Sequence, residues 1–218
     1  DISVLVNLFG TVKRVAMGVT MGGKERTTAM DLREVGELLA QLRQPEPPRS
    51  LREAAALLPL VKTVLSMKPK TVSKPACQEI VWRGGDIDLG KLPIQTCWPG
   101  EPAPLITWPL VVTKGPGEAR EDNYNLGIYR MQVLNKTQTI MRWLKHRGGA
   151  QHHQRWAKEK TAPLPAAIVL GADPGIMLAA VTPVPETLSE YQFAGLLRGQ
   201  AMVLADCVSQ PLKVPAEA

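Results

Sequence analysis

Three side chains of the kinds that bind metal ions, Asn125, His146 and Glu190, occur in the part of the chain from 125 to 190. They stand among apolar segments typical of strands or helices, where an amide or a charged group needs a partner. From 130 to 160 the chain carries eight Lys or Arg residues and a single acid. Such a local excess of positive charge favours a ligand that carries phosphate.

The same residue types also have structural roles. Glu190 follows Thr187 at the spacing of a capping box, in which the carboxylate serves only the start of a helix. A lone histidine such as His146 is more often a surface or hydrogen-bonded residue than a ligand. The adjacent His152 and His153 would point to opposite faces of a strand, so we interpret both as surface residues.

Length and composition are those of a globular protein. The 218 residues suffice for one large domain or for pieces of two, and 44% apolar against 21% charged residues excludes disorder across the whole chain. No apolar run is long enough to span a membrane. The first residues include neither an initiator Met nor a signal peptide, which indicates the middle of a longer chain.

The cysteines and the net charge indicate the cellular compartment and the kinds of ligand to expect. Cys77, Cys97 and Cys207 are widely spaced and make neither a disulfide framework nor a Cys-x-x-Cys metal site, which favours a reducing cytoplasm. We expect Cys97, beside Trp98, to be buried. A net charge of +6 is compatible with nucleic acid, an anionic membrane surface or an anionic small molecule. Aromatic residues are not interleaved with the basic ones, so a nucleic-acid module is the weaker alternative.

Helical patterns dominate the N-terminal part. An amphipathic helix is expected from Thr28, where a Thr-x-x-Asp start precedes leucines at helical spacing. A capping box at Ser50 begins a second helical segment, which Pro59 should kink or break. The pattern changes at 68–73, where we expect a domain boundary.

Short apolar runs separated by Pro, Gly and Asp follow that boundary. We interpret as strands 79–82, 105–113, 126–133, 139–144, 166–171 and 201–208. Short connections between most of them imply antiparallel pairing, with Asn135 and Lys136 at the tip of a hairpin. A closed or split β-barrel fits this order better than a parallel sheet.

Two helices are expected near the C-terminal end of the sequence. Asp173 and Pro174 supply a cap acceptor and a first-position proline for one of them. The other should run over 188–198, with Thr187 as its cap and Gly199 as its C-terminal glycine.

Several motifs resemble the UbiD family of carboxy-lyases, which use prenylated FMN. They are NLGIYR at 125–130, MRWLKHRGGA at 141–150, LGADP at 170–174 and TPVPETLSEYQFAGLLRG at 182–199, with further likeness at 7–17 and 92–108. The resemblance spans nearly the whole chain. Within the family it is nearest to the members that decarboxylate 3-polyprenyl-4-hydroxybenzoate in ubiquinone biosynthesis.

The resemblance implies an α+β fold in two parts. A portion of a small N-terminal α/β domain is expected over 1–70. A split β-barrel of the flavin-reductase type, which binds the prenylated FMN, is expected over 71–218 and should be incomplete at its C-terminus.

The resemblance also implies a ligand set. By position, Asn125, His146 and Glu190 match the family's ligands for a divalent metal, usually manganese, that ties the flavin phosphate to the protein. Amide and carboxylate oxygens suit a hard cation, and one imidazole is compatible with manganese. The positions that match potassium ligands in some members are Ala179, Ala180 and Thr182. The positions that match contacts to the prenylated flavin are Ile128, Tyr129, Arg130, Arg142, Trp143, Leu144, Arg147 and Gly148.

The implied reaction is removal of carbon dioxide from an aromatic or α,β-unsaturated carboxylic acid. Arg130 matches the family's catalytic arginine, which can orient a carboxylate through two parallel hydrogen bonds. The two acids that work with it, including the proton donor, are expected beyond Ala218. The chain is therefore either part of an active decarboxylase or a non-catalytic flavin-binding or assembly fragment.

Further partners follow from the same resemblance. They are a small carboxylic acid as substrate, a flavin prenyltransferase as the source of the cofactor, and other copies of the chain in a homo-oligomer. No nucleic-acid partner is expected. A cytoplasmic location is expected, with peripheral association at the inner membrane.

One feature of the spacing needs a structural explanation. Asn125 and Arg130 are an odd number of residues apart, so a regular strand would direct them to opposite faces. We therefore expect a bulge or bend at Gly127 that redirects one of them.

Overall fold

The computed structural model describes residues 36–37, 40, 50–117, 124–184 and 189–218. Most of the helix expected from Thr28 lies outside these ranges. The chain forms two compact units. Unit 1 contains the segment that ends at Thr71 together with Ala172–Leu204, and unit 2 contains Val72–Gly171 together with Ala205–Ala218.

Unit 1 includes helix α3 (Leu51–Ser66), which continues without a break through Pro59. The break predicted at this proline is wrong. A proline inside a helix removes one hydrogen bond, and the three alanines before Pro59 and the leucines on both sides of it favour the helix strongly enough to continue it. None of the helices that the structure describes is long and apolar enough to cross a bilayer.

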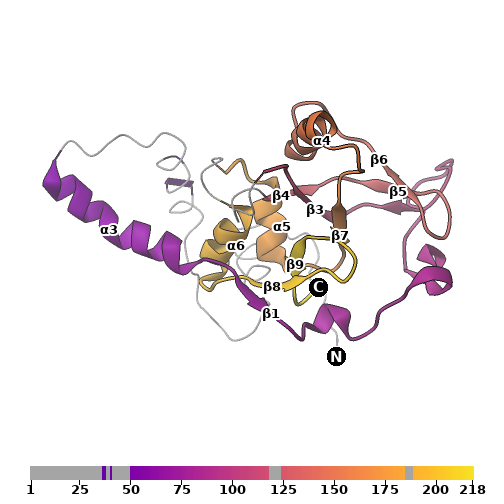
Figure 1. The fold of residues 1–218 in the computed structure, drawn as a ribbon, viewed down its shortest axis with the longest axis horizontal. Coiled ribbons are helices and arrows are strands. Elements are labelled where there is room, and N and C mark those ends of the chain that lie inside the picture. Colours follow the sequence, from indigo (N-terminus) through magenta and orange to yellow (C-terminus); the bar gives the residue numbers. More distant parts are fainter. Residues whose placement is uncertain (1–35, 38–39, 41–49, 118–123, 185–188) are drawn as a thin grey trace. The chain divides into compact units, whose positions relative to one another are not determined.

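Within the described residues of unit 1, helices α5 (Pro174–Val181) and α6 (Glu190–Arg198) pack against each other (Figure 1). The Asp173 carboxylate accepts a hydrogen bond from the Gly175 N–H at 2.7 Å, as its cap position predicts. Gly199 ends α6 in the left-handed conformation, with φ of 70°, so this prediction is also confirmed. The predicted start of α6 is wrong, because the Ser189 hydroxyl accepts from the Tyr191 N–H and caps the helix.

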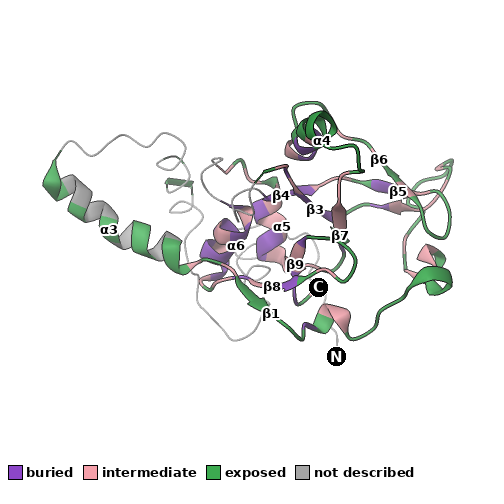
Figure 2. Cartoon of the chain, in the orientation of Figure 1, coloured by how far each residue is buried: buried purple, intermediate pink, exposed green. Residues whose placement is uncertain are grey.

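The central strand of unit 2 is β3 (Leu110–Lys114), whose first four residues are buried (Figure 2). It pairs antiparallel with β4 (Tyr124–Ile128) on one side and β7 (Ala166–Val169) on the other. A second antiparallel sheet contains β2 (Leu105–Ile106), β5 (Met131–Val133) and β6 (Thr139–Met141). The hairpin between β5 and β6 is confirmed.

The predicted strands 105–113 and 126–133 each divide between these two sheets. Pro109, which has no N–H to donate to a ladder, separates β2 from β3. The dipeptide Tyr129-Arg130 separates β4 from β5. Met131 of β5 contributes with Ile106 and Val111 to a buried cluster against which Tyr129 and Trp143 pack.

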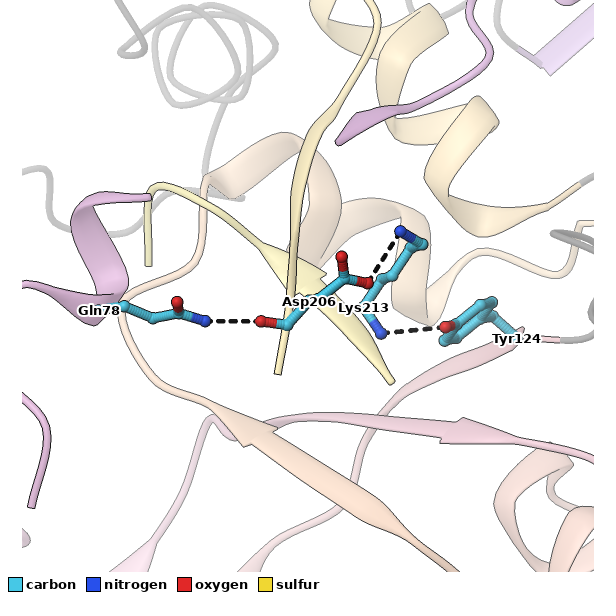
Figure 3. Close-up of polar contacts among 4 residues, drawn as sticks. All are labelled: Gln78, Tyr124, Asp206 and Lys213. Carbon is cyan, nitrogen blue, oxygen red and sulfur yellow. Dashed lines mark hydrogen bonds and ion pairs between the residues drawn. The ribbon is translucent and has the colours of Figure 1, made fainter. Parts of the chain in front are cut away.

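A third sheet has the order β1–β8–β9, made of β1 (Lys70–Val72), β8 (Val203–Asp206) and β9 (Lys213–Pro215). Polar contacts join β9 to its neighbours in unit 2 (Figure 3). The Lys213 N–H donates to the Tyr124 hydroxyl at 3.0 Å, and the Lys213 ammonium lies 2.9 Å from the Asp206 carboxylate. The Gln78 amide donates to the Asp206 carbonyl at 2.7 Å. The start of β4 is thereby tied to β9.

The strand predicted over 79–82 is wrong, because this segment lies in irregular structure after the 3₁₀ turn Ala76–Gln78. Both Ile80 and Trp82 are exposed, so the segment lacks the buried face that would favour a strand. Two further 3₁₀ turns follow, Gly84–Asp86 and Leu89–Lys91.

The expected burial of Cys97 is also wrong, because both Cys97 and Trp98 are exposed. The Glu101 carboxylate accepts from the N–H groups of Cys97 and Trp98 and holds a surface turn there. The described residues nevertheless confirm the α+β class, because they combine α-helices with three three-stranded sheets. The split β-barrel stays a prediction.

Candidate functional site

Asn125, on β4, reaches the start of helix α4 (Gly148–Glu159). Its side-chain oxygen occupies the space that a Cβ atom on Gly148 would need, and its Cγ would lie 2.7 Å from that atom. Any larger residue at Gly148 would displace the Asn125 amide. The glycine therefore allows a strand side chain and the first residue of a helix to meet.

Tyr129 folds back over the same strand. A Cβ on Gly127 would collide with the Tyr129 ring, so this glycine leaves the space that the ring fills. The Tyr129 hydroxyl accepts from the Asn125 side-chain amide at 3.4 Å and from the Gly149 N–H at 3.3 Å. Asn125, Tyr129, Gly148 and Gly149 therefore meet at the N-terminus of α4.

The bulge expected at Gly127 is wrong. The ladder between β3 and β4 pairs residues one to one from Lys114 and Tyr124 to Leu110 and Ile128. The chain leaves this ladder only after Ile128, and the exposed Arg130 lies in the link to β5. Gly127 is therefore needed for the close approach of an aromatic ring and not for a bend.

Trp143, in the segment that follows β6, completes the cluster. Its ring meets Tyr129 edge to face, with ring centroids 6.0 Å apart, and a Cβ on Gly149 would lie 2.9 Å from its Cε2 atom. Its Nε1 atom is buried without a hydrogen-bond partner, the one such side-chain atom within the described parts of the chain. A buried donor without an acceptor costs free energy, so a ligand acceptor at this position would be favoured. We call Asn125, Tyr129, Trp143, Gly148 and Gly149 the glycine cradle.

The charge around the glycine cradle favours an anion. The first turn of α4 contains no acidic residue, and its cap residue Arg147 gives no side-chain cap. The N-terminus of a helix attracts negative charge through its N–H groups and its dipole. Arg142 and Arg147, both exposed, precede this helix start in sequence.

The remaining predicted residues lie in different parts of the molecule. Ile128 is half-buried at the end of β4, while Leu144 and His146 are exposed in the segment before α4. Glu190 is the half-buried first residue of α6, in unit 1, so its convergence with Asn125 and His146 stays a prediction. Ala179 and Ala180 lie in α5, and the hydroxyl of the following Thr182 donates to the Leu178 carbonyl at 2.7 Å.

His152 is a residue whose position the sequence did not reveal. It is buried, 6% exposed, on α4, and its Nδ1 atom lies 3.0 Å from the Thr113 hydroxyl on β3. The surface assignment of His152 is wrong because the segment is helical, which places His152 on the same face as the buried Gly149, three residues earlier. Burial, with a smaller contribution from Arg155, lowers the pKa of His152 to about 4. The imidazole is therefore neutral near pH 7.

Comparison with known proteins relates the chain to decarboxylases. A family model described as UbiD, 3-octaprenyl-4-hydroxybenzoate carboxy-lyase Rift-related domain, matches residues 70–218. The 3,4-dihydroxybenzoic acid decarboxylase AroY of Klebsiella pneumoniae is 29% identical, with a TM-score of 0.63 over 76% of this chain and 35% of that one.

Two further solved structures are similar. The UbiD-class enzyme HmfF of Pelotomaculum thermopropionicum, in complex with FMN, is 26% identical, with a TM-score of 0.63 over 76% of this chain and 37% of that one. Vanillic acid decarboxylase of Sedimentibacter hydroxybenzoicus is 24% identical and shares the fold, with a TM-score of 0.70 over 97% of this chain and 40% of that one. This chain thus spans 35% to 40% of the length of these solved chains. The family model covers well over half of its residues, and the chain belongs to the UbiD family of carboxy-lyases.

Proposed function

We propose that this chain is the cofactor-holding part of a decarboxylase that uses prenylated FMN, held through a divalent metal, to remove carbon dioxide from an aromatic or α,β-unsaturated carboxylic acid. The glycine cradle is the observation that carries the proposal. Structures of HmfF contain FMN and, in an evolved dimeric form, prenylated FMN, which supports a flavin for this chain as well.

The cradle fits the phosphate end of such a cofactor. Trp143 Nε1 is a buried donor that needs an acceptor, and the start of α4 favours negative charge. The Asn125 amide oxygen suits a hard cation such as manganese, with His146 and Glu190 as the other proposed protein ligands. Ala179, Ala180 and Thr182 are the proposed potassium ligands.

Arg130 is the residue of this chain that we propose acts on the substrate. When bound, prenylated FMN supplies an electron sink for the electron pair that decarboxylation leaves on an unsaturated carbon. The Arg130 side chain is exposed in the link between β4 and β5, where a guanidinium can hold a carboxylate by two parallel hydrogen bonds.

The proposed substrate is a 4-hydroxybenzoate that carries a substituent at carbon 3. Two comparisons support this class. The matching family model is described by a 3-octaprenyl-4-hydroxybenzoate, and AroY acts on 3,4-dihydroxybenzoic acid. A polyprenyl substituent would also account for peripheral association with a membrane.

Binding of FMN and riboflavin tests the cofactor site, because these flavins differ only in the phosphate. Quenching of flavin fluorescence should show FMN binding at least about tenfold more tightly than riboflavin in the presence of Mn²⁺. G148A should remove most of this preference, because its Cβ displaces the Asn125 amide. G85A is the matched control, since a Cβ at Gly85 meets no atom within 4 Å. Equal affinities for both flavins in the unaltered chain would refute the cofactor site.

Carbon dioxide exchange tests catalysis separately. Oxygen-free reconstitution with prenylated FMN, Mn²⁺ and K⁺ should give exchange with a 3-substituted 4-hydroxybenzoate in a longer form of the protein that includes the two expected acids. The same assay on this chain tests whether it is active without them. R130K should lose most of this activity while it keeps flavin binding. If the flavin binds through its phosphate but neither protein exchanges carbon dioxide, the non-catalytic alternative holds.

A further inference from the structure

Helix α4 buries very few of its side chains. Its buried residues are Gly149, Ala150 and His152, all within the first two turns. Of these, only His152 has a side chain that extends beyond Cβ. The position of the helix start relative to β3 and β4 therefore depends heavily on this imidazole.

The partner of His152 lies directly beside the glycine cradle. Thr113 is fully buried on β3, and it pairs with Asn125 across the ladder to β4. The bond of 3.0 Å between His152 Nδ1 and the Thr113 hydroxyl therefore joins α4 to the residue that lies opposite Asn125.

We propose that His152 is a positioning residue of the cofactor site, which holds the first turn of α4 against β3 and β4 through Thr113. The N–H of Gly149 then stays at the Tyr129 hydroxyl, and the backbone of Gly148 stays at the Asn125 amide. This inference rests on the proposed function, in which the glycine cradle receives the flavin phosphate.

The contacts inside the cradle are too weak to fix the helix by themselves. The two hydrogen bonds to the Tyr129 hydroxyl, at 3.3 and 3.4 Å, lie beyond the usual range for N–H donors. The His152–Thr113 bond is shorter and fully buried, and its loss leaves a buried polar group unsatisfied. A displacement of about half an ångström is enough to weaken a preorganised binding site.

Replacements of His152 that differ in where they place a polar atom give the sharpest test. Asparagine places its amide near the position of the imidazole Nδ1, whereas glutamine places it near Nε2. We expect H152A and H152Q to weaken FMN binding about tenfold with riboflavin binding unchanged, and H152N to stay within about threefold of the wild type. T113V should behave like H152A, and T113S, which keeps the hydroxyl, like the wild type. Q154A, on the exposed face of α4, is the control.

Hydrogen exchange without any ligand provides a second measurement. The Gly149 and Ala150 amides should exchange faster in H152Q than in H152N, in conditions where circular dichroism shows both variants folded. A merely structural histidine would lower the melting temperature and leave the ratio of FMN to riboflavin affinity unchanged.

The outcomes separate this inference from the proposed function. If the wild type prefers FMN and H152A and T113V keep the same preference, His152 does not position the site. If the wild type shows no preference for FMN, the proposed function fails. Faster exchange in H152Q than in H152N would then still support the anchoring of α4, and equal exchange would refute it.

Discussion

At the scale of single residues, Gly127 and Tyr129 depend on each other for space. The Tyr129 ring fills the space in which a Cβ on Gly127 would lie, so G127A must displace the ring and its contacts with Asn125 and Gly149. We expect G127A to destabilise the protein by about 1–3 kcal/mol, the usual cost of overpacking. In a Y129A background the same substitution should cost much less, because the ring is absent. Urea unfolding of the four proteins in the cycle measures the difference, and equal costs in both backgrounds would contradict the contact.

The neutral state of His152 gives a second residue-scale prediction. Burial lowers its folded-state pKa to about 4 from 6.5, so the unfolded chain binds a proton at a higher pH than the folded chain does. The contribution of His152 to stability is therefore complete above pH 6.5 and is lost as the pH falls toward 4. Arg155 adds to this effect.

Urea unfolding at pH 7 and pH 5 provides the measurement. The wild type should lose more free energy of unfolding between these values than H152N, in which the titrating group is absent. Carboxylates titrate equally in both proteins and cancel in the comparison. Equal losses in the two proteins would show that the histidine is not held neutral.

At the scale of elements, a buried ion pair joins α5 to α6. Asp173, at the start of α5, lies 3.4 Å from the guanidinium of Arg198 at the end of α6, and both side chains are at most 6% exposed. Gly175 leaves room for the Arg198 stem, since a Cβ there would lie 2.9 Å from Arg198 Cγ. The pair therefore joins the start of α5 to the end of α6.

Breaking this pair on one side should be costly. D173N keeps a cap acceptor for Gly175 but removes the carboxylate that lies 3.4 Å from the buried Arg198 guanidinium, so we expect a loss of about 3–5 kcal/mol in the free energy of unfolding. R198M removes the charge and keeps most of the volume. The double variant D173N/R198M should lose less free energy of unfolding than the sum of the losses in D173N and R198M. Additive losses in thermal unfolding would show that the pair is not coupled.

The same elements show which features local sequence could predict. Asp173-Pro174 and Gly199 act through backbone groups two to four residues away, so their patterns indicated the helix ends correctly. Helix α4 has no side-chain cap and begins with two glycines, so no local pattern marked it. The division of each predicted long strand depends on which sheet each half joins, which is a property of tertiary structure.

The residues of the candidate site also depend on tertiary structure. Asn125, Trp143 and Gly148 were identified by resemblance to a family, because no spacing within one element connects them. His152 was missed because its burial depends on a helix that the sequence did not reveal and on Thr113, which is 39 positions away. Contacts between distant segments of the chain determine both which residues form the candidate site and whether His152 is buried.

At the scale of the whole molecule, the proposed metal should add to the stability that bound FMN provides. Its proposed protein ligands are Asn125, His146 and Glu190. A ligand that binds only the folded state stabilises it by about 2.7 kcal/mol at one hundred times its Kd. Mn²⁺ added to the FMN-bound chain should therefore raise the melting temperature.

E190Q should remove this Mn²⁺-dependent increase and keep the increase caused by FMN alone, because the amide is a weaker ligand for a hard cation than the carboxylate. E79Q, at an exposed acid outside the proposed site, should respond to Mn²⁺ like the wild type. Differential scanning calorimetry with FMN, with and without Mn²⁺, distinguishes the variants. A full Mn²⁺ response in E190Q would remove Glu190 from the ligand set.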